Sequence, residues 1–284
     1  MKKQRIFAVA LLLALLLTAV SGCGNRRGNL PAVAHPVILG DPIATYEYGI
    51  LFLSGNVALR DQVWAAMQVL SARGEVSMIA RNWFGHDTTI IPGDFEATDR
   101  LGDVRERTFI IGFDPYNAPM SFFDASGEIV GFDIDLARAV CDYFGWELRA
   151  HPIDWANREI ELVSGNVDAL WGGINRLESV PDRLIQTDAY LENHQVVLVL
   201  STANYRNHRA LRGETLAVRN GSIGERALLE NTSFADRLGD ITARSSLYFA
   251  LRDLSNGVVD AVIMDEVSAH FYIRTGDTAA FRQR

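Results

Sequence analysis

The chain has 284 residues, of which 48% are hydrophobic, so it is long enough to bury a full core in one or two domains. Its formal net charge of -8 at pH 7 argues against nucleic acid as a partner and slightly favours cationic ligands. The six histidines are scattered, and no CxxC, HExxH, GxSxG or P-loop pattern occurs. The sequence therefore predicts neither a metal nor another cofactor.

Residues 1–22 have the layout of a secretory signal peptide. Three basic residues precede the apolar run "IFAVALLLALLLTAV", and small residues then lead to Cys23. This run is too short and too tightly bounded for a membrane span. "TAVSGC" resembles the lipobox of bacterial lipoproteins, which implies cleavage before Cys23, lipid on its sulfur and a tether over residues 23–34. An ordinary signal peptide with a chance cysteine is the alternative.

The next segment, residues 35–86, has the pattern of a strand followed by two helices. "TYEYGILFL" is rich in β-formers and ends at the turn "SGN". "ALRDQVWAAMQVLSARG" has apolar residues at helical spacing and ends at a glycine, and a second short helix, "EVSMIARNWFG", ends at Gly85. Residues 87–108 show little periodicity and several turn formers, so they are predicted to be a linker.

From residue 108 onward, short apolar strands alternate with helical patterns. "TFIIGF" and "ELRAHPI" are predicted strands, "SFFDASGEIVGF" a hairpin, and "DIDLARAVCDYFGW" a helix that places Cys141 at an apolar position, as a buried structural thiol. A helix "NREIELVSG" and a strand "VDALWGGI" follow. This alternation predicts an α/β fold with mainly parallel sheets.

Two stretches about ninety residues apart repeat one layout. "ELVSGNVDALWGGI" and "LRDLSNGVVDAVIMDE" each end a helix at glycine and enter an apolar strand through Val-Asp-Ala. Ligands of open α/β sheets bind beyond the carboxyl ends of the strands. The repeat indicates two similar lobes that face one cleft, although any two βα units share some of this layout.

Several blocks in order resemble the family 3 extracellular solute-binding proteins, the polar amino-acid receptors of ABC importers. They are "FDPYNAPMSFFDASGEIVGFDIDLARAV", "PIDWANREIELVSGNVDALWGGI", "TDAYLENHQVVLV" and "NGVVDAVIMDEVSAHFYI". The resemblance implies an α/β, two-lobed periplasmic-binding-protein-like fold (type II), with a small-molecule ligand between lobes that close on it. It also implies a monomer that docks on a transporter permease.

The same resemblance explains why a terminal-looking helix comes so early. In the family a strand near "YGI" and helices ending in "WFG" close the chain, whereas here they precede its beginning. Residues 109–284 followed by 35–86 restore the family's order, so we expect a circular permutation with residues 87–108 joining the old termini. The first lobe would then comprise 35–86 and 109–192, and 193–284 would form mainly the second lobe with a return toward the first. An unrelated helical addition over 35–86 is the alternative.

Some site residues follow from the resemblance in the first lobe. Asp114 corresponds to a residue near the ligand side chain, with a turn or cap aspartate as the structural alternative. Tyr116 and Asn117 compete for the position of an aromatic residue beside it. Trp155 corresponds to an aromatic that covers the ligand, where an indole face can hold a cationic or aliphatic group.

Others lie in the second half of the chain. Asp265 corresponds to the carboxylate that holds the ligand's α-ammonium, since a bound cation would offset the cost of burying that charge. Ser222 and Ile223, with Gly221, resemble the turn at a helix N-terminus that meets the ligand carboxylate.

The main departure from the family lies in "WGGINRLESVPDR". Gly173 and Asn175 are candidate ligand-binding residues in this segment. Counted without gaps from Gly173, Asn175 and Leu177 take the places of two threonines, and Val180 takes that of the arginine that clamps the ligand carboxylate. Arg183 replaces this arginine if the register shifts by three residues, and Arg176 lies beside the pocket. Alternatively, the ligand has no carboxylate, and the acidic residues and Trp155 bind an amine or another cation.

The leading hypothesis is therefore a lipid-anchored receptor on the extracytoplasmic face of a bacterial membrane. It would bind an amino acid or related amine for an ABC importer, and it would not be an enzyme. A ligand-sensing module without a transport role is the second hypothesis. A cyclohexadienyl dehydratase-like enzyme, with Asp114 as the acid, is the third.

Overall fold

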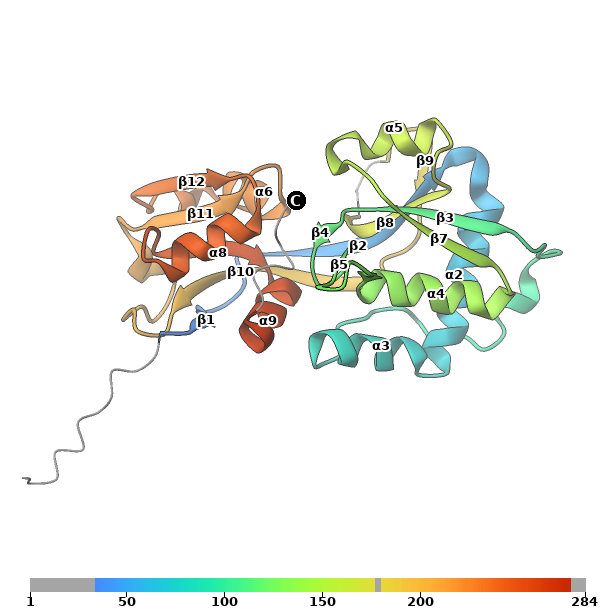
Figure 1. Cartoon of the computed structure of the whole chain (residues 1–284), viewed down its shortest axis with the longest axis horizontal. Helices are drawn as coiled ribbons and strands as arrows, with labels where there is room; N and C mark the ends of the chain where they lie inside the picture. Colours follow the sequence, from blue (N-terminus) through green and yellow to red (C-terminus); the bar gives the residue numbers. More distant parts are fainter. Residues whose placement is uncertain (1–33, 177–179, 277–284) are drawn as a thin grey trace, which may run out of the picture. The chain divides into compact units, whose positions relative to one another are not determined.

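The computed structural model describes residues 34–176 and 180–276, and residues from His35 onward form one structural unit (Figure 1). The predicted signal peptide, Cys23 and nearly all of the tether lie outside the described residues. Within the described ranges, no helix combines the length and the hydrophobicity needed to cross a membrane.

Ten strands of the described chain join in one large sheet. They are β1 (Pro36–Ile38), β2 (Ala44–Leu53), β3 (Thr108–Phe113), β7 (Glu147–Pro152), β8 (Ala169–Asn175), β9 (Leu184–Gln186), β10 (Leu191–Leu200), β11 (Thr215–Arg219), β12 (Asp240–Arg244) and β13 (Ala261–Asp265). Their order is β12-β11-β13-β10-β2-β8-β3-β7, with β1 paired to β10 and β9 paired to β2. A small sheet contains β4 (Tyr116–Asn117), β5 (Ser121–Phe123) and β6 (Ile129–Val130).

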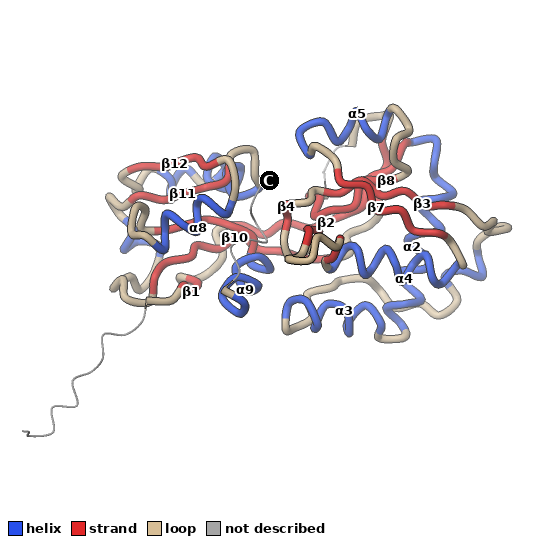
Figure 2. Tube along the Cα trace, viewed as in Figure 1, coloured by secondary structure: helices blue, strands red, loops and turns tan. Residues whose placement is uncertain are grey.

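The helices cover this sheet (Figure 2). They are α2 (Val57–Ala72), α3 (Glu75–Phe84), α4 (Phe132–Phe144), α5 (Arg158–Val163), α6 (Ile223–Glu230), α7 (Thr232–Ala235), α8 (Leu247–Ser255) and α9 (Glu266–Thr275). Four 3₁₀ turns are described as well: η1 (Ser54–Asn56), η2 (Ala97–Arg100), η3 (Trp155–Asn157) and η4 (His208–Leu211). The predicted α/β class is confirmed.

The large sheet consists of two similar halves, which we call the lobes. In the first lobe β3 runs parallel to β7 and β8, and β2 is antiparallel to β8. In the second lobe β11 runs parallel to β12 and β13, and β10 is antiparallel to β13. The long strands β2 and β10 pair with each other and connect the lobes (Figure 1).

One aspartate in each lobe explains the repeated Val-Asp-Ala pattern. Asp168 accepts a hydrogen bond from the backbone N–H of Ile110 at 2.8 Å, and Asp260 accepts one from that of Thr215 at 2.9 Å. Each aspartate also donates its own backbone N–H to the carbonyl of the same partner residue. The pattern therefore marks a β-strand start that is bonded to its parallel neighbour, once in each lobe.

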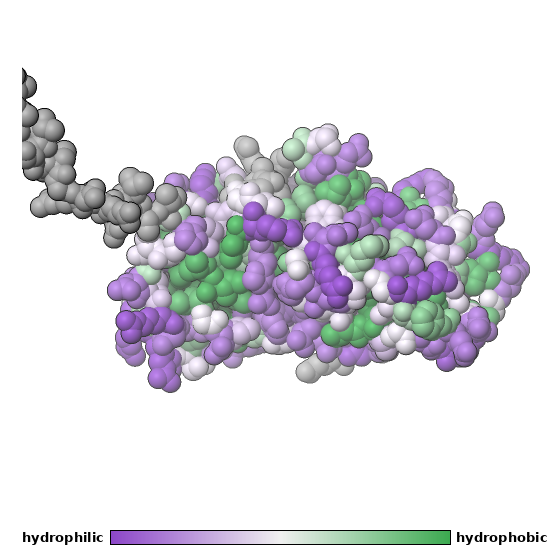
Figure 3. Space-filling model, turned by 90° about the horizontal axis from the view of Figure 1, so that it is seen from below, coloured by the Kyte–Doolittle hydropathy of each residue, from purple (hydrophilic) through white to green (hydrophobic). Residues whose placement is uncertain are grey.

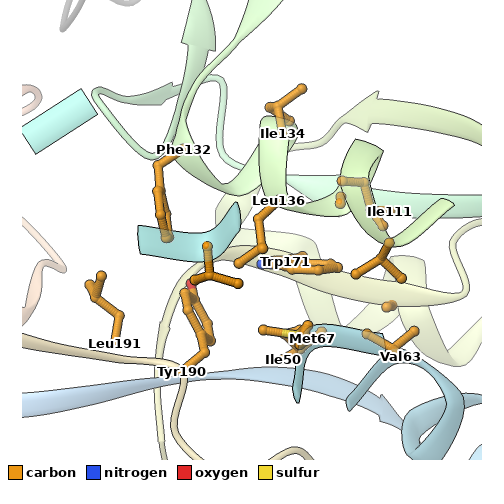
Figure 4. Packing of buried hydrophobic residues seen from close by; sticks show 14 of the residues in the cluster. Ile50, Val63, Met67, Ile111, Phe132, Ile134, Leu136, Trp171, Tyr190 and Leu191 are labelled. Carbon is orange, nitrogen blue, oxygen red and sulfur yellow. The ribbon is translucent and has the colours of Figure 1, made fainter. Parts of the chain in front are cut away.

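The core of the first lobe joins segments from both sides of the predicted linker. Ile50 of β2 and Met67 of α2 are fully buried in one cluster with Ile111 of β3 and Trp171 of β8, and Figure 4 shows these side chains meeting. The strand predicted from "TYEYGILFL" thus belongs to the same lobe as residues 109–190, where it pairs with β8 and β9.

The predicted linker runs along α2. The backbone N–H of Asp94 donates to the carbonyl of Gln68 at 3.1 Å, and Ala97 is buried against Ala65 and Val69. A Cβ at Gly93 would lie 3.0 Å from the Cα of Ala72, so this close contact favours glycine. These contacts fix the path from α3 to β3.

Three residues in or beside the helices α3 and α4 show how these helices end and how they pack against the core. α3 ends before Gly85, which has a φ of 86° and donates its N–H to the carbonyl of Arg81, as its sequence predicts. Cys141 is buried in α4, and burial raises the pKa of its thiol to about 12. Asp133, in the first turn of α4, does not cap the helix: it is buried in the core, where its carboxylate accepts from the hydroxyl of Tyr190 and the N–H of Gly173.

Hydrophilic residues cover most of the face drawn in Figure 3, with hydrophobic residues gathered in smaller areas between them. Along the described chain, exposed large hydrophobic side chains come from several segments, such as Met78 of α3 and Phe95 before η2. Isolated exposed groups of this kind are normal for a folded domain.

Candidate functional site

A cavity of about 450 Å³ lies between the two lobes. The first lobe lines it with Leu51, Trp155, Arg158, Glu159, Leu170, Gly173, Ile174, Asn175 and Leu184. The second lobe lines it with Gly221, Ser222, Ile223, Glu225, Arg226 and Leu229. Both walls carry charged side chains of both signs, so we call this cavity the interlobe cleft.

Five of the site residues predicted from the sequence line the interlobe cleft together. Trp155, Gly173 and Asn175 come from the first lobe, and Ser222 and Ile223 come from the second. All five are half-buried, which leaves part of each open to a ligand. The structure therefore brings together residues that lie up to 68 positions apart in the sequence.

Trp155 begins the η3 turn and holds an arginine against its ring. The guanidinium carbon of Arg158 lies 5.4 Å from the ring centroid, and Arg158 Nη1 donates to the carbonyl of Trp155 at 2.8 Å. The next residue, Glu159, accepts from Arg183 Nη2 at 2.7 Å. Arg183 is 60% exposed and stands outside the lining residues, held at the rim by Glu159.

Gly173, on the cleft wall, lies close to two polar side chains, those of Asn117 and Asp133. It has a φ of 67°, and a Cβ there would lie 2.6 Å from Asn117 Nδ2. Its N–H donates to Asp133 Oδ2 at 2.9 Å, and the hydroxyl of Tyr190 donates to the other oxygen at 2.9 Å. Burial raises the pKa of Asp133 to about 7, although both hydrogen bonds favour its charged form.

The N-terminus of α6 is capped by its own side chains. Ser222 Oγ accepts from the N–H of Glu225 at 3.2 Å, while the Glu225 carboxylate accepts from the N–H of Gly221 at 2.7 Å. This reciprocal pair is a capping box, which the S-x-x-E spacing from Ser222 indicates. A carboxylate thus already lies at the turn that the family resemblance assigns to a ligand carboxylate.

Asp114, at the end of β3, is not among the residues that line the cleft. It is 3% exposed, and its carboxylate accepts from the N–H of Tyr116 at 3.0 Å and from Arg219 Nη2 at 2.9 Å. Arg219 ends β11 in the other lobe and was not selected from the sequence. The sequence did contain a clue to this residue, because Arg219 directly precedes the turn that contains Ser222.

Three further predicted residues lie behind the lining. Asn117 is buried and donates through Nδ2 to the carbonyl of Gly172 at 3.2 Å, beside the half-buried Tyr116. The carboxylate of Asp265 accepts from Asn193 Nδ2 at 3.0 Å and from Gln195 Nε2. Burial raises the pKa of Asp265, while these two amides favour its ionised form.

The segment that departs from the family is only partly described. Val180 packs, partly buried, against a hydrophobic cluster with Leu184, whereas Leu177 lies outside the described residues. Arg176 lies near Glu47 and Asp188, at 3.8 and 3.6 Å. Over residues 34–176 and 180–276, no group of three or more His, Cys, Asp or Glu side chains is placed to hold a metal ion.

Comparisons with known proteins relate this chain to one protein family. Residues 109–282 match the model for bacterial extracellular solute-binding proteins, family 3. The histidine-binding periplasmic protein of Salmonella typhimurium is 28% identical over 162 residues, which are 56% of this chain and 61% of the relative. The arginine-binding extracellular protein ArtP of Bacillus subtilis is 24% identical over 150 residues, 52% of this chain and 58% of the relative. The chain thus spans about three fifths of the length of the curated relatives it matches.

Solved structures show the same fold. An ABC uptake transporter substrate-binding protein from Streptococcus pneumoniae with bound histidine has a TM-score of 0.54 and 29% identity, covering 60% of this chain and 70% of that one. An ancestral arginine-binding protein bound to glutamine has a TM-score of 0.51 and 27% identity, covering 61% and 76%. These neighbours confirm the predicted type II periplasmic-binding-protein fold. Since the family model matches more than half of the chain, the chain belongs to the bacterial extracellular solute-binding proteins of family 3.

Proposed function

We propose that the protein is an extracytoplasmic receptor that binds a small polar, amine-bearing ligand, an amino acid or a related cation, for an ABC importer, and that it is not an enzyme. The observation that carries this proposal is the interlobe cleft, whose walls come from both lobes. A ligand that contacts both walls stabilises the closed arrangement, and a permease can recognise that arrangement. The relatives named for histidine and arginine binding support the same ligand class.

The lining residues support a ligand with an ammonium and a carboxylate group. Glu159 and Glu225 offer carboxylates to an ammonium, and the face of Trp155 offers an apolar or cation–π surface. Arg158, rather than the rim residue Arg183, is the candidate partner for a carboxylate on the first-lobe wall. Asp265 remains a second candidate for the ammonium, from its position at the end of β13.

Isothermal titration calorimetry of the purified protein with the twenty amino acids and a set of amines tests this function. We expect saturable binding of at least one ligand, and Trp155→Ala should weaken it. Phe95→Ala, which changes a side chain that is 68% exposed outside the cleft, is the matched control. No binding across the whole panel would overturn the proposal.

We also propose that the protein is held at the membrane by lipid on Cys23, with residues 23–34 as the tether. The lipobox-like sequence before Cys23 supports this. Expressed in a bacterium, the full chain should fractionate with membranes, whereas Cys23→Ser should release it. Equal fractionation of both forms would contradict the anchor.

The chain order is the third proposal, a circular permutation. It is supported by β2, α2 and α3, which complete the sheet and core of the first lobe although they precede β3. A rearranged chain that starts at residue 107, continues to 284 and is joined by a flexible linker to residues 35–86 should fold and bind the same ligand. Failure of this rearranged chain to fold would count against the permutation.

Sensing without transport is the second candidate function. It is favoured by Val180, which packs into a hydrophobic cluster at the position where the family resemblance places an arginine. Uptake of the bound ligand by cells that express the chain with its neighbouring transporter genes separates the two functions. Binding without uptake would support sensing.

A further inference from the structure

Asp114 and Arg219 occupy equivalent positions in the two lobes. Ile110 of β3 and Thr215 of β11 each donate a backbone N–H to the aspartate that begins the neighbouring strand. The next residue in each strand, Ile111 or Leu216, pairs with the alanine that follows that aspartate. Asp114 follows Ile110 by four residues, and Arg219 follows Thr215 by four residues. Both therefore lie at the carboxyl end of the strand that is central among the parallel strands of its lobe, β3 in the first and β11 in the second.

These equivalent positions carry opposite charges and meet across the lobes. Arg219 Nη2 lies 2.9 Å from Asp114 Oδ2, and the two side chains are 19% and 4% exposed. Most of this ion pair is therefore shielded from water, where separation of the partners would leave a buried charge alone. The same guanidinium lowers the pKa of Asp265, against the upward effect of burial.

The ion pair lies directly behind the interlobe cleft. Two residues after Arg219, the chain enters the cleft wall at Gly221 and Ser222. On the other side, a Cβ at Gly172 would lie 3.2 Å from the backbone nitrogen of Asp114, and the next residue, Gly173, lines the cleft. Arg219 thus pairs with the buried carboxylate of Asp114 and acts electrostatically on the half-buried carboxylate of Asp265.

A buried carboxylate at a binding cleft recruits a cation from the ligand unless the protein supplies one. Here the protein supplies it from the opposite lobe. A second cation brought by a ligand would meet the Arg219 charge at the same place and would be repelled.

We propose that Arg219 is a specificity-determining residue: its ion pair with Asp114 holds the lobes together and directs the cleft away from ligands with a positively charged side chain. This inference rests on the proposed receptor function. It adds the ligand class that the inner end of the cleft rejects.

The test replaces Arg219 and measures ligand selectivity and lobe closure. In Arg219→Gln, Asp114 loses its partner, and the lost side-chain volume leaves room beside its carboxylate. We expect the affinity for arginine and for agmatine to rise about tenfold or more relative to an uncharged amino acid, the effect of one gained charge-assisted hydrogen bond. The radius of gyration of the ligand-free variant, measured by small-angle X-ray scattering, should exceed that of the wild type.

Two variants control the experiment. Asp114→Asn combined with Arg219→Gln removes the carboxylate as well, so the gain for cationic ligands should disappear. Arg244→Gln breaks a partly buried ion pair of Arg244 and Asp253, 2.6 Å long, within the second lobe alone. This variant should leave both the selectivity and the radius of gyration at their wild-type values.

The outcomes separate this inference from the proposed function. Gained cation binding in Arg219→Gln that is lost in the double variant supports the inference. Unchanged selectivity overturns it, with or without an increase in radius of gyration. A wild type that binds nothing in the panel contradicts the receptor function, and the binding of arginine or agmatine to Arg219→Gln still decides the role of Arg219.

Discussion

The two lobes share a scaffold and differ where their strands end. In each lobe, an aspartate at the start of one strand bonds to the backbone of the neighbouring parallel strand. It is Asp168 before β8 in the first lobe and Asp260 before β13 in the second. At the other end of these strands, Gly173 of β8 stands where β13 has Asp265. At the ends of the neighbouring strands β3 and β11, Asp114 stands where the second lobe has Arg219. Residues that build the sheet are therefore the same in the two lobes, whereas the residues at the carboxyl ends of the strands differ.

This difference shows how one architecture makes an asymmetric site. A repeated strand-end residue would give two like charges facing each other, which repel. Opposite charges at equivalent positions instead attract across the lobes. Glycine in one lobe and a carboxylate in the other likewise make the equivalent ends of β8 and β13 chemically different.

The largest effect on stability is expected when a large side chain is truncated to alanine at two equivalent core positions, one in each lobe. Trp171 of β8 and Ile263 of β13 are both fully buried in the hydrophobic cores of their lobes. Trp171→Ala should lower the free energy of unfolding by about 3–5 kcal/mol and Ile263→Ala by about 2–5 kcal/mol, because each leaves a cavity. Urea unfolding measures both, and losses below about 1 kcal/mol would show that the cores are not packed as described.

The next effect should arise in the first lobe from Asp133, whose pKa is raised by burial to about 7. Between about pH 4 and 7 the folded state holds a proton on Asp133 that the unfolded state has lost, so the free energy of unfolding falls as the pH rises. The fall attributable to this group is about 4 kcal/mol at most. Asp133→Asn cannot titrate, and its unfolding curve should be flatter over this range; a parallel pair of curves would contradict the assignment.

Smaller and equal effects should follow from removing the shared aspartates. Asp168→Ala and Asp260→Ala each leave a backbone N–H of the neighbouring parallel strand without its side-chain acceptor, which costs about 1–3 kcal/mol. Thermal or urea unfolding of the two variants should give similar losses. A loss of stability in only one of the two variants would contradict the structural equivalence of the lobes.

The smallest effect should appear in ligand binding when the hydroxyl of the second-lobe wall is removed. Ser222→Ala deletes the α6 cap that accepts from Glu225, so we expect a loss of about 1 kcal/mol in stability and a modest loss of affinity. Calorimetry and unfolding measured on the same samples separate the two effects. Full affinity in Ser222→Ala would show that the Ser222 hydroxyl does not hold the ligand.

The sequence was sufficient to predict features that depend on neighbouring residues. Periodicity predicted β2, α2 and α4, glycine predicted the end of α3, and the Val-Asp-Ala repeat indicated two similar units. The Arg219–Asp114 pair could not be predicted, because its partners are 105 residues apart and meet only when two lobes pack. Likewise, the local sequence places Asp133 at the start of a helix, and only the folded core shows that Tyr190 and Gly173 donate hydrogen bonds to it.

Hydrogen–deuterium exchange with and without the best ligand from the amino-acid panel tests the central claim, a site shared by both lobes, most directly. Residues 155–159 of the first lobe and residues 221–226 of the second line the interlobe cleft from opposite sides. A ligand bound between them should slow exchange in both segments at the same ligand concentration. Slower exchange in one segment only, or in neither, would contradict a site built by the two lobes.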